Sequence, residues 1–257
     1  MNYQEYGAAN RNTLLLLHGG GLSWWNYREE AELLQSEYRV ILPILDGHAG
    51  SDRPFTTIES NAAEIISFID GHLGGSVLLI GGLSLGGQIL LEMLAQRNDI
   101  CRYALVESAP VLPDRLTHAL ISPAFGCSYG LLRNKSFARL QFQSLHIQPA
   151  LFGDYYRDTC QIKKADMIAF LKANTGYTLK KSIESCSARV RVAIGGRENR
   201  RVLKSAKLLE KTVPGCAAQV LPSFRHGDFS LNHAKDYVQM LHQILREKYV
   251  YALLNDK

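Results

Sequence analysis

The chain has 257 residues, of which 46% are hydrophobic and 21% charged, and its formal net charge is +5. These fractions are typical of an ordinary soluble globular protein. No apolar stretch approaches the roughly 20 residues that a membrane-spanning helix needs. Residues 1–6 lack the basic and apolar segments of a signal peptide. We therefore expect a single globular unit that does not act at a membrane.

Strands and helices alternate along most of the chain. Short apolar runs predict strands at residues 14–17, 38–42, 77–81, 103–106, 190–194 and 218–221. Between them, apolar residues at helical spacing predict helices around residues 62–73 and 89–94, and a last helix buries apolar positions between 237 and 245. This alternation implies a mostly parallel central sheet with helices on both faces.

The pattern breaks between residues 112 and 187, where no strand-like run occurs. This segment is rich in aromatic residues and carries a formal charge of its own equal to that of the whole chain, +5. Its basic residues are scattered and form no basic stripe of the kind that nucleic-acid-binding proteins use. A solvated surface explains them, and steering of an anionic substrate is the alternative.

A serine flanked by glycines follows the third predicted strand, in the order Gly82-Leu83-Ser84-Leu85-Gly86, and a helical stretch comes next. This strand–turn–helix context is that of a nucleophile elbow. The serine sits at a sharp turn, for which we expect a positive φ. Side chains two residues before and after it would collide with the strand and the helix, so glycine is required there.

Three other polar segments follow predicted strands. The first strand runs into His18-Gly19-Gly20-Gly21, the fifth into Gly195-Gly196-Arg197-Glu198, and the last leads to His226-Gly227-Asp228. The carboxyl ends of parallel strands meet at one edge of the sheet, where ligands bind. The sequence therefore predicts that Ser84, Glu198 and His226 lie at this edge.

Taken together, these motifs resemble the α/β-hydrolase family over nearly the whole chain. Two departures stand out: the acid position holds Glu198 where Asp is more usual, and the segment around His48 carries Ile44 and Ala49 where the family has Asp and Gly. The resemblance implies an α/β-hydrolase core formed by residues 1–111 and 188–257. It also implies that residues 112–187 form an inserted helical cap over the active site.

The chemistry that these residues predict is nucleophilic catalysis. A serine hydroxyl needs a base to become a good nucleophile, and His226 is the candidate for Ser84. Glu198 would orient the histidine, with Glu107 and Asp228 as alternatives for the acid. The backbone amides of Gly20 and Leu85 would form the oxyanion hole.

We therefore predict a serine esterase for a small-to-medium carboxylic ester, with no metal, cofactor, nucleic-acid or membrane partner. Serine at the elbow argues against haloalkane dehalogenases and epoxide hydrolases, two branches of the family that the chain resembles, because both use Asp there. A C–C bond hydrolase, a thioesterase, a lyase and a ligand-sensing protein remain alternatives with the same triad. We expect the substrate pocket to be lined by aromatic side chains from the glycine loop and the cap: Trp24, Trp25, Phe125 and Tyr129.

Five widely spaced cysteines indicate reduced thiols and a cytoplasmic location, because an odd number with irregular spacing suits neither a disulfide framework nor a zinc site. They are Cys101, Cys127, Cys160, Cys186 and Cys216.

Overall fold

A seven-stranded sheet with the order β1-β3-β2-β4-β5-β6-β7 forms the centre of the protein. The computed structural model describes the backbone of residues 1–255 and the side chains of residues 1–126 and 128–246. All neighbouring strands are parallel except β1, which pairs antiparallel with β3 at one edge. The strands are β1 (Tyr3–Tyr6), β2 (Thr13–Leu17), β3 (Arg39–Pro43), β4 (Val77–Leu83), β5 (Cys101–Glu107), β6 (Arg189–Gly195) and β7 (Ala217–Leu221).

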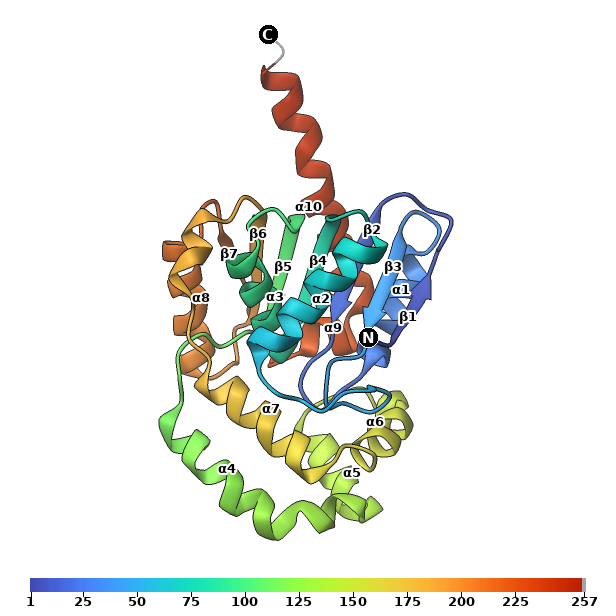
Figure 1. Ribbon diagram of the computed structural model, residues 1–257, viewed down its shortest axis with the longest axis vertical. Helices are drawn as coiled ribbons and strands as arrows, with labels where there is room; N and C mark the ends of the chain where they lie inside the picture. The colour runs from blue at the N-terminus through green and yellow to red at the C-terminus, as the bar shows by residue number, and fades with distance from the viewer. Residues whose placement is uncertain (256–257) are drawn as a thin grey trace.

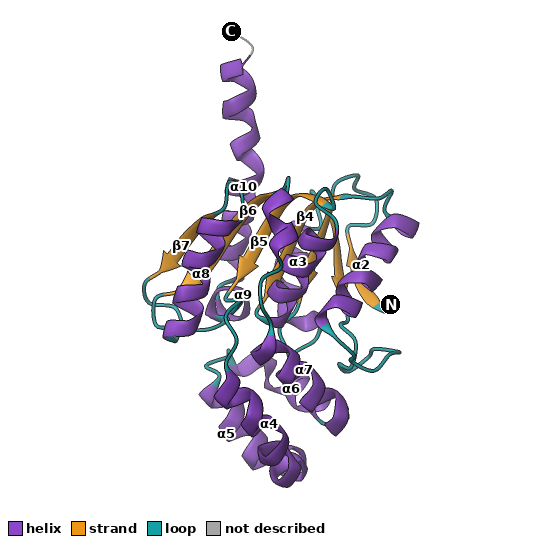
Figure 2. Ribbon diagram, turned by 60° about the vertical axis from the view of Figure 1, so that its left-hand side comes forward, coloured by secondary structure: helices purple, strands orange, loops and turns teal. Residues whose placement is uncertain are grey.

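Helices cover both faces of this sheet, as Figures 1 and 2 show. One face carries α2 (Ile58–His72), α3 (Leu85–Gln96) and α8 (Arg200–Thr212), and the other carries α1 (Arg28–Leu34) and α10 (Ala234–Asn255). Each face of the sheet packs against its helices through an apolar cluster, and alternate residues of the buried strand β2 belong to the two clusters. Leu15 and Leu17 lie in one cluster, and Leu14 and Leu16 lie in the other. Burial on both faces explains why β2 is an unbroken apolar run.

The segment between β5 and β6 is entirely helical. It contains α4 (Arg115–Ser128), α5 (Lys135–Ser144), α6 (Phe152–Thr159) and α7 (Lys164–Gly176), and the short 3₁₀ helices η2 (Tyr129–Arg133), η3 (Pro149–Leu151) and η4 (Lys181–Ser185). Figure 1 shows α4 to α7 gathered beyond the edge of the sheet at which β5 runs out toward α4. Two further short elements, η1 (Trp24–Tyr27) and α9 (Asp228–Asn232), lie in the loops at this same edge.

The predicted fold class is confirmed: the sheet is mostly parallel, helices cover both faces, and all six predicted strands are present. The edge strand β1 was not predicted. Within the described part of the chain, no helix is both long and apolar enough to cross a membrane. Cys101, Cys160, Cys186 and Cys216 are free thiols, and the side chain of Cys127 lies outside the described residues.

Candidate active site

Ser84 occupies the turn between β4 and α3 with a φ of 51°, a strained conformation for a residue other than glycine. Its backbone is fixed from both sides, because Ser84 N–H donates to the Glu107 carbonyl at 2.8 Å and its carbonyl accepts from Gln88 N–H at 2.9 Å. A Cβ at Gly86 would lie 2.1 Å from the Leu17 carbonyl oxygen, so only glycine fits there. The turn therefore has the geometry of a nucleophile elbow.

Glu198 and His226 form a hydrogen-bonded pair at the neighbouring strand ends. His226 Nδ1 lies 2.8 Å from Glu198 Oε2, and the other carboxylate oxygen accepts from Ser108 Oγ at 2.6 Å and from Gly195 N–H at 2.9 Å. The Glu198 side chain is fully buried, whereas that of His226 is 48% exposed. The carboxylate is thus held inside the protein while the imidazole reaches the surface of a cavity.

The environment of Glu198 favours its ionised form. Burial raises the pKa of this carboxyl, but hydrogen bonds from His226, Ser108 and Gly195 together outweigh burial and hold the pKa below its ordinary value. An ionised carboxylate on Nδ1 fixes the tautomer of His226 with Nε2 as the free acceptor.

The other two candidate acids do not contact His226. Glu107 is buried and accepts from Ser230 N–H at 3.2 Å. Burial raises its pKa to about 7, which favours the neutral acid. Asp228 accepts from Arg225 N–H at 2.7 Å and from the Asn232 side chain at 2.8 Å. Of the three carboxylates, Glu198 is the one that lies on the imidazole.

The glycine loop after β2 is held by side chains beneath it. Gly19 N–H donates to Asn26 Oδ1 at 3.2 Å, and Gly21 N–H donates to His48 Nε2 at 3.0 Å. Within the described residues, the intervening Gly20 N–H has no hydrogen-bond acceptor. A Cβ at Gly20 would lie 3.5 Å from a methyl group of Leu85. Leu85 is the first residue of α3, so its backbone N–H has no acceptor within the helix. The two residues predicted to supply the oxyanion hole are therefore neighbours in space.

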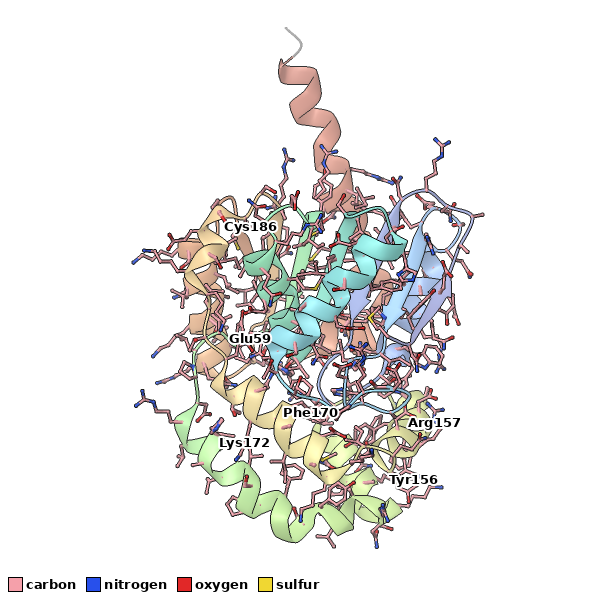
Figure 3. All side chains as sticks on the ribbon, in the orientation of Figure 1. Glu59, Tyr156, Arg157, Phe170, Lys172 and Cys186 are labelled. Atoms are coloured by element: carbon pink, nitrogen blue, oxygen red, sulfur yellow. The ribbon has the colours of Figure 1, made fainter. Side chains whose placement is uncertain are left out.

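Two buried histidines, both in their neutral forms, hold this loop in place. Burial lowers the pKa of His48 to about 4 and also lowers that of His18. A neutral His48 accepts from Gly21 at Nε2 and donates from Nδ1 to the Asp46 carbonyl. The ring of Phe170, labelled on α7 in Figure 3, stacks on His48 with centroids 4.5 Å apart. His48 is thus a structural residue that connects α7 to the glycine loop.

Ser84, Glu198 and His226 line one cavity of about 380 Å³. In the described structure, the side chains of Ser84 and His226 are not hydrogen-bonded to each other; such bonds are often long in a site without substrate. The remaining lining residues come from the glycine loop, the end of α5, the loops after β6 and β7, and α9: Gly19, Gly20, Leu22, Leu83, Ser144, Leu145, His146, Ile147, Arg197, Asn199, Arg225, Gly227 and Leu231.

The four aromatic residues predicted to line this cavity do not do so. Trp25 is buried in the core and donates from Nε1 to Asp158 at 2.8 Å, and Trp24 lines a separate groove beside the N-terminus. Phe125 packs against the core, and the Tyr129 hydroxyl donates to the Ile162 carbonyl. These rings join elements to one another because their apolar bodies fill the space between helices.

The helical segment between β5 and β6 reaches the cavity through residues 144–147 instead. His146 has a φ of 56°, and its carbonyl accepts from the Asn232 side chain at 2.8 Å. Gln148 N–H donates to the same Asn232 side chain, which fastens this loop to α9. Residues 144–147, Ser108 and Asn26 are the parts of the site that sequence reasoning missed. The positive φ at His146 could not be read from its residue type.

The sequence profile of the alpha/beta hydrolase family matches residues 14–181. The chain belongs to this family. An uncharacterized hydrolase of Bacillus subtilis (strain 168), YugF, is 30% identical over 100 residues, which cover 38% of this chain and 37% of that protein. The soluble epoxide hydrolase of Corynebacterium sp. (strain C12) is 29% identical over 92 residues, 34% of this chain and 31% of that enzyme. The match therefore spans about a third of the length of these curated relatives.

Solved structures share the fold over nearly the whole chain. A thermophilic esterase from Thermogutta terrifontis superimposes with a TM-score of 0.77 at 19% identity and covers 96% of this chain and 93% of its own. An enol-lactonase from Burkholderia xenovorans LB400 gives 0.79 at 15% identity and covers 95% of this chain and 96% of its own. At such identities the likeness concerns the fold, and the reaction must be argued from the site.

Proposed function

We propose that this protein is a serine hydrolase that cleaves a small-to-medium carboxylic ester through an acyl-enzyme intermediate. The observation that carries the proposal is the cavity in which Ser84, on its strained turn, and His226, bound to the buried carboxylate Glu198, share one surface. Nucleophile, base and orienting acid are thus available to one bound molecule.

In the first half of the reaction, Ser84 Oγ attacks the ester carbonyl carbon and His226 Nε2 takes the hydroxyl proton. The carbonyl electron pair moves to oxygen, and the backbone N–H groups of Gly20 and Leu85 stabilise the oxyanion. Loss of one such donor costs on the order of 3 kcal/mol of transition-state stabilisation. When the carbonyl reforms, the bond to the alcohol oxygen breaks and His226 gives its proton to the leaving alcohol.

In the second half, water attacks the acyl group on Ser84 while His226 removes a proton from that water. Collapse of the second tetrahedral intermediate breaks the bond to Oγ, returns the proton to Ser84 and releases the carboxylic acid. Glu198 stays ionised throughout and stabilises the imidazolium formed in each half. All electrons and protons are accounted for by ester and water alone.

Serine at position 84 supports ester cleavage over epoxide opening. An epoxide hydrolase of this family attacks with a carboxylate, which the elbow of this chain does not carry. Esterases are among the proteins that share the fold.

We propose that residues 112–187 serve as the cap of this site. Free thiols in the described structure support a reducing compartment such as the cytoplasm.

The test compares Ser84→Ala with the matched control Ser23→Ala. Ser23 comes just after the glycine loop in the sequence and does not line the cavity. We expect Ser84→Ala to abolish hydrolysis of 4-nitrophenyl acetate and butyrate with a nearly unchanged Tm, because alanine keeps the Cβ and leaves the strained turn as it is. The control should keep its activity. Full activity in Ser84→Ala would refute the proposal. Turnover of a thioester or a vinylogous diketone, but of no ester, would assign the triad to a different reaction.

A further inference from the structure

Two arginines belong to the lining of the catalytic cavity. Arg197 follows β6 and immediately precedes the acid Glu198, and Arg225 immediately precedes the base His226. Both side chains are exposed, and both line the same cavity as Ser84. Neither has a role in the ester hydrolysis derived above.

Backbone contacts hold the two arginine-bearing loops side by side. Gly196 N–H donates to the Leu221 carbonyl at 2.8 Å, and Arg197 N–H donates to the Phe224 carbonyl at 3.0 Å. The loops approach so closely that a Cβ at Gly195 would lie 2.3 Å from the Phe224 carbonyl oxygen. Since the backbone of both loops is fixed beside the same cavity, a ligand there can bind both arginines without loop rearrangement.

The negative charge near these arginines is already committed. Glu198 is the one carboxylate among the lining residues, and its oxygens accept from His226, Ser108 and Gly195. Asp228 lies outside the lining and is held by backbone and amide N–H groups. Among the residues that the structure describes, the guanidinium groups of Arg197 and Arg225 have no ion-pair partner.

Several other arginines of this protein are paired with carboxylates. Arg157 binds Asp154 and Asp158, each at 2.6 Å, and Arg28 binds Asp154 at 2.9 Å. By contrast, the catalytic cavity combines an apolar wall with two cations that pair with none of the described acidic side chains. The apolar wall consists of Leu22, Leu83, Leu145, Ile147 and Leu231.

We propose that the preferred substrate is an anionic ester, in which a second, ionised carboxylate binds Arg197 and Arg225 while the ester carbonyl lies at Ser84. A guanidinium group matches a carboxylate in planar, bidentate geometry. A cavity of about 380 Å³ admits a short chain between the two groups, as in the half-ester of a short diacid. This inference rests on the proposed ester hydrolysis and names its substrate class.

The experiment measures kcat/KM by pH-stat titration for two substrate pairs that differ in one carboxylate. Monoethyl glutarate against ethyl pentanoate places the charge on the acyl side, and 3-acetoxybenzoate against phenyl acetate places it on the alcohol side. We expect the anionic member of at least one pair to be favoured about tenfold or more, and added salt to reduce this preference.

The variants assign the preference to the two arginines. In the double variant Arg197→Gln/Arg225→Gln the ratio of anionic to neutral kcat/KM should fall about tenfold. The matched control is Arg11→Gln, which removes an exposed arginine before β2, at the opposite edge of the sheet, and should keep the ratio. Glutarate should also slow fluorophosphonate labelling of the wild-type protein more than that of the double variant.

Two results would overturn the inference while leaving the proposed function intact: equal turnover of both members of each pair, or a preference that survives the double substitution. Absence of any ester hydrolysis, together with absence of labelling at Ser84, would instead refute the proposed function and the inference with it.

Discussion

Replacement of the buried acid Glu107 by Gln should make the stability of the protein less dependent on pH. Burial raises the pKa of Glu107 from 4.5 to about 7 in the folded protein. Between these values the unfolded chain has released a proton that the folded protein still holds. The stabilisation is therefore complete below pH 4.5 and is lost as the pH rises through about 7.

The magnitude follows from the two pKa values. A tenfold change in proton affinity corresponds to about 1.4 kcal/mol, so the difference between 4.5 and about 7 corresponds to about 3 kcal/mol. Urea unfolding at pH 5, 7 and 9 should show the wild type losing about 3 kcal/mol more than Glu107→Gln over this range. One carboxyl oxygen of Glu107 is buried without a hydrogen-bond partner, so the amide introduced by Glu107→Gln would also lack a partner there. This lowers the free energy of unfolding of the variant by the same amount at every pH.

Parallel stability curves for the two proteins would refute this reasoning, because they would show that Glu107 is ionised in the fold at neutral pH. A loss of ester hydrolysis in Glu107→Gln as large as that in Glu198→Gln would refute the choice of triad acid. The Glu198→Gln variant serves as the comparison. The Glu198 carboxyl of the wild type has a lowered pKa, so its stabilising effect should be lost as the pH falls, not as it rises.

Three further predictions concern the chemistry of the site. Glu198→Gln should lower kcat for 4-nitrophenyl butyrate by up to about 10⁴-fold, whereas Asp228→Asn should keep most activity; the reverse order would mean that the acid is misassigned. Asn26→Ala frees Gly19 N–H, loosens the oxyanion loop and should lower kcat about tenfold in the same assay, with an unchanged rate arguing against this role. Across a series of neutral 4-nitrophenyl esters, kcat/KM should rise with acyl chain length until the chain fills the cavity and then fall, because each buried methylene stabilises the transition state by up to about 0.8 kcal/mol. A continued rise into emulsified long-chain esters would contradict a closed cap.

The fold followed from the sequence wherever a strand was buried on both faces. The apolar runs of β2 and β4 have no polar alternation, so their pattern alone indicates the centre of a parallel sheet. The edge strand β1, Tyr3–Tyr6, has the mixed sequence YQEY and pairs on one side with β3. Its strand state depends on that partner, 34 or more residues away, and a local pattern does not contain this information.

The site divides in the same way. The positions of Ser84, Glu198 and His226 could be placed at one sheet edge because each follows a strand of predicted direction. The bond from Ser108 to Glu198 joins residues 90 apart in the sequence and arises from the packing of β5 against β6.

The helical segment between β5 and β6 was the least predictable part. Its aromatic content indicated apolar packing, but nothing local determines which side of a helix faces the cavity. Phe142 packs edge-on against Phe152, 5.4 Å away, and Tyr155 lies 5.1 Å from Phe142. The rings therefore stabilise this helical segment internally, and residues 144–147 form its part of the cavity lining.

The central claim is that Ser84 is a nucleophile activated by His226. The most direct measurement is covalent labelling with a fluorophosphonate, followed by mass mapping of the modified peptide. The account predicts one modified residue, Ser84, with labelling abolished in Ser84→Ala and strongly slowed in His226→Ala. Labelling at another serine such as Ser23, or a rate at Ser84 that does not depend on His226, would contradict it.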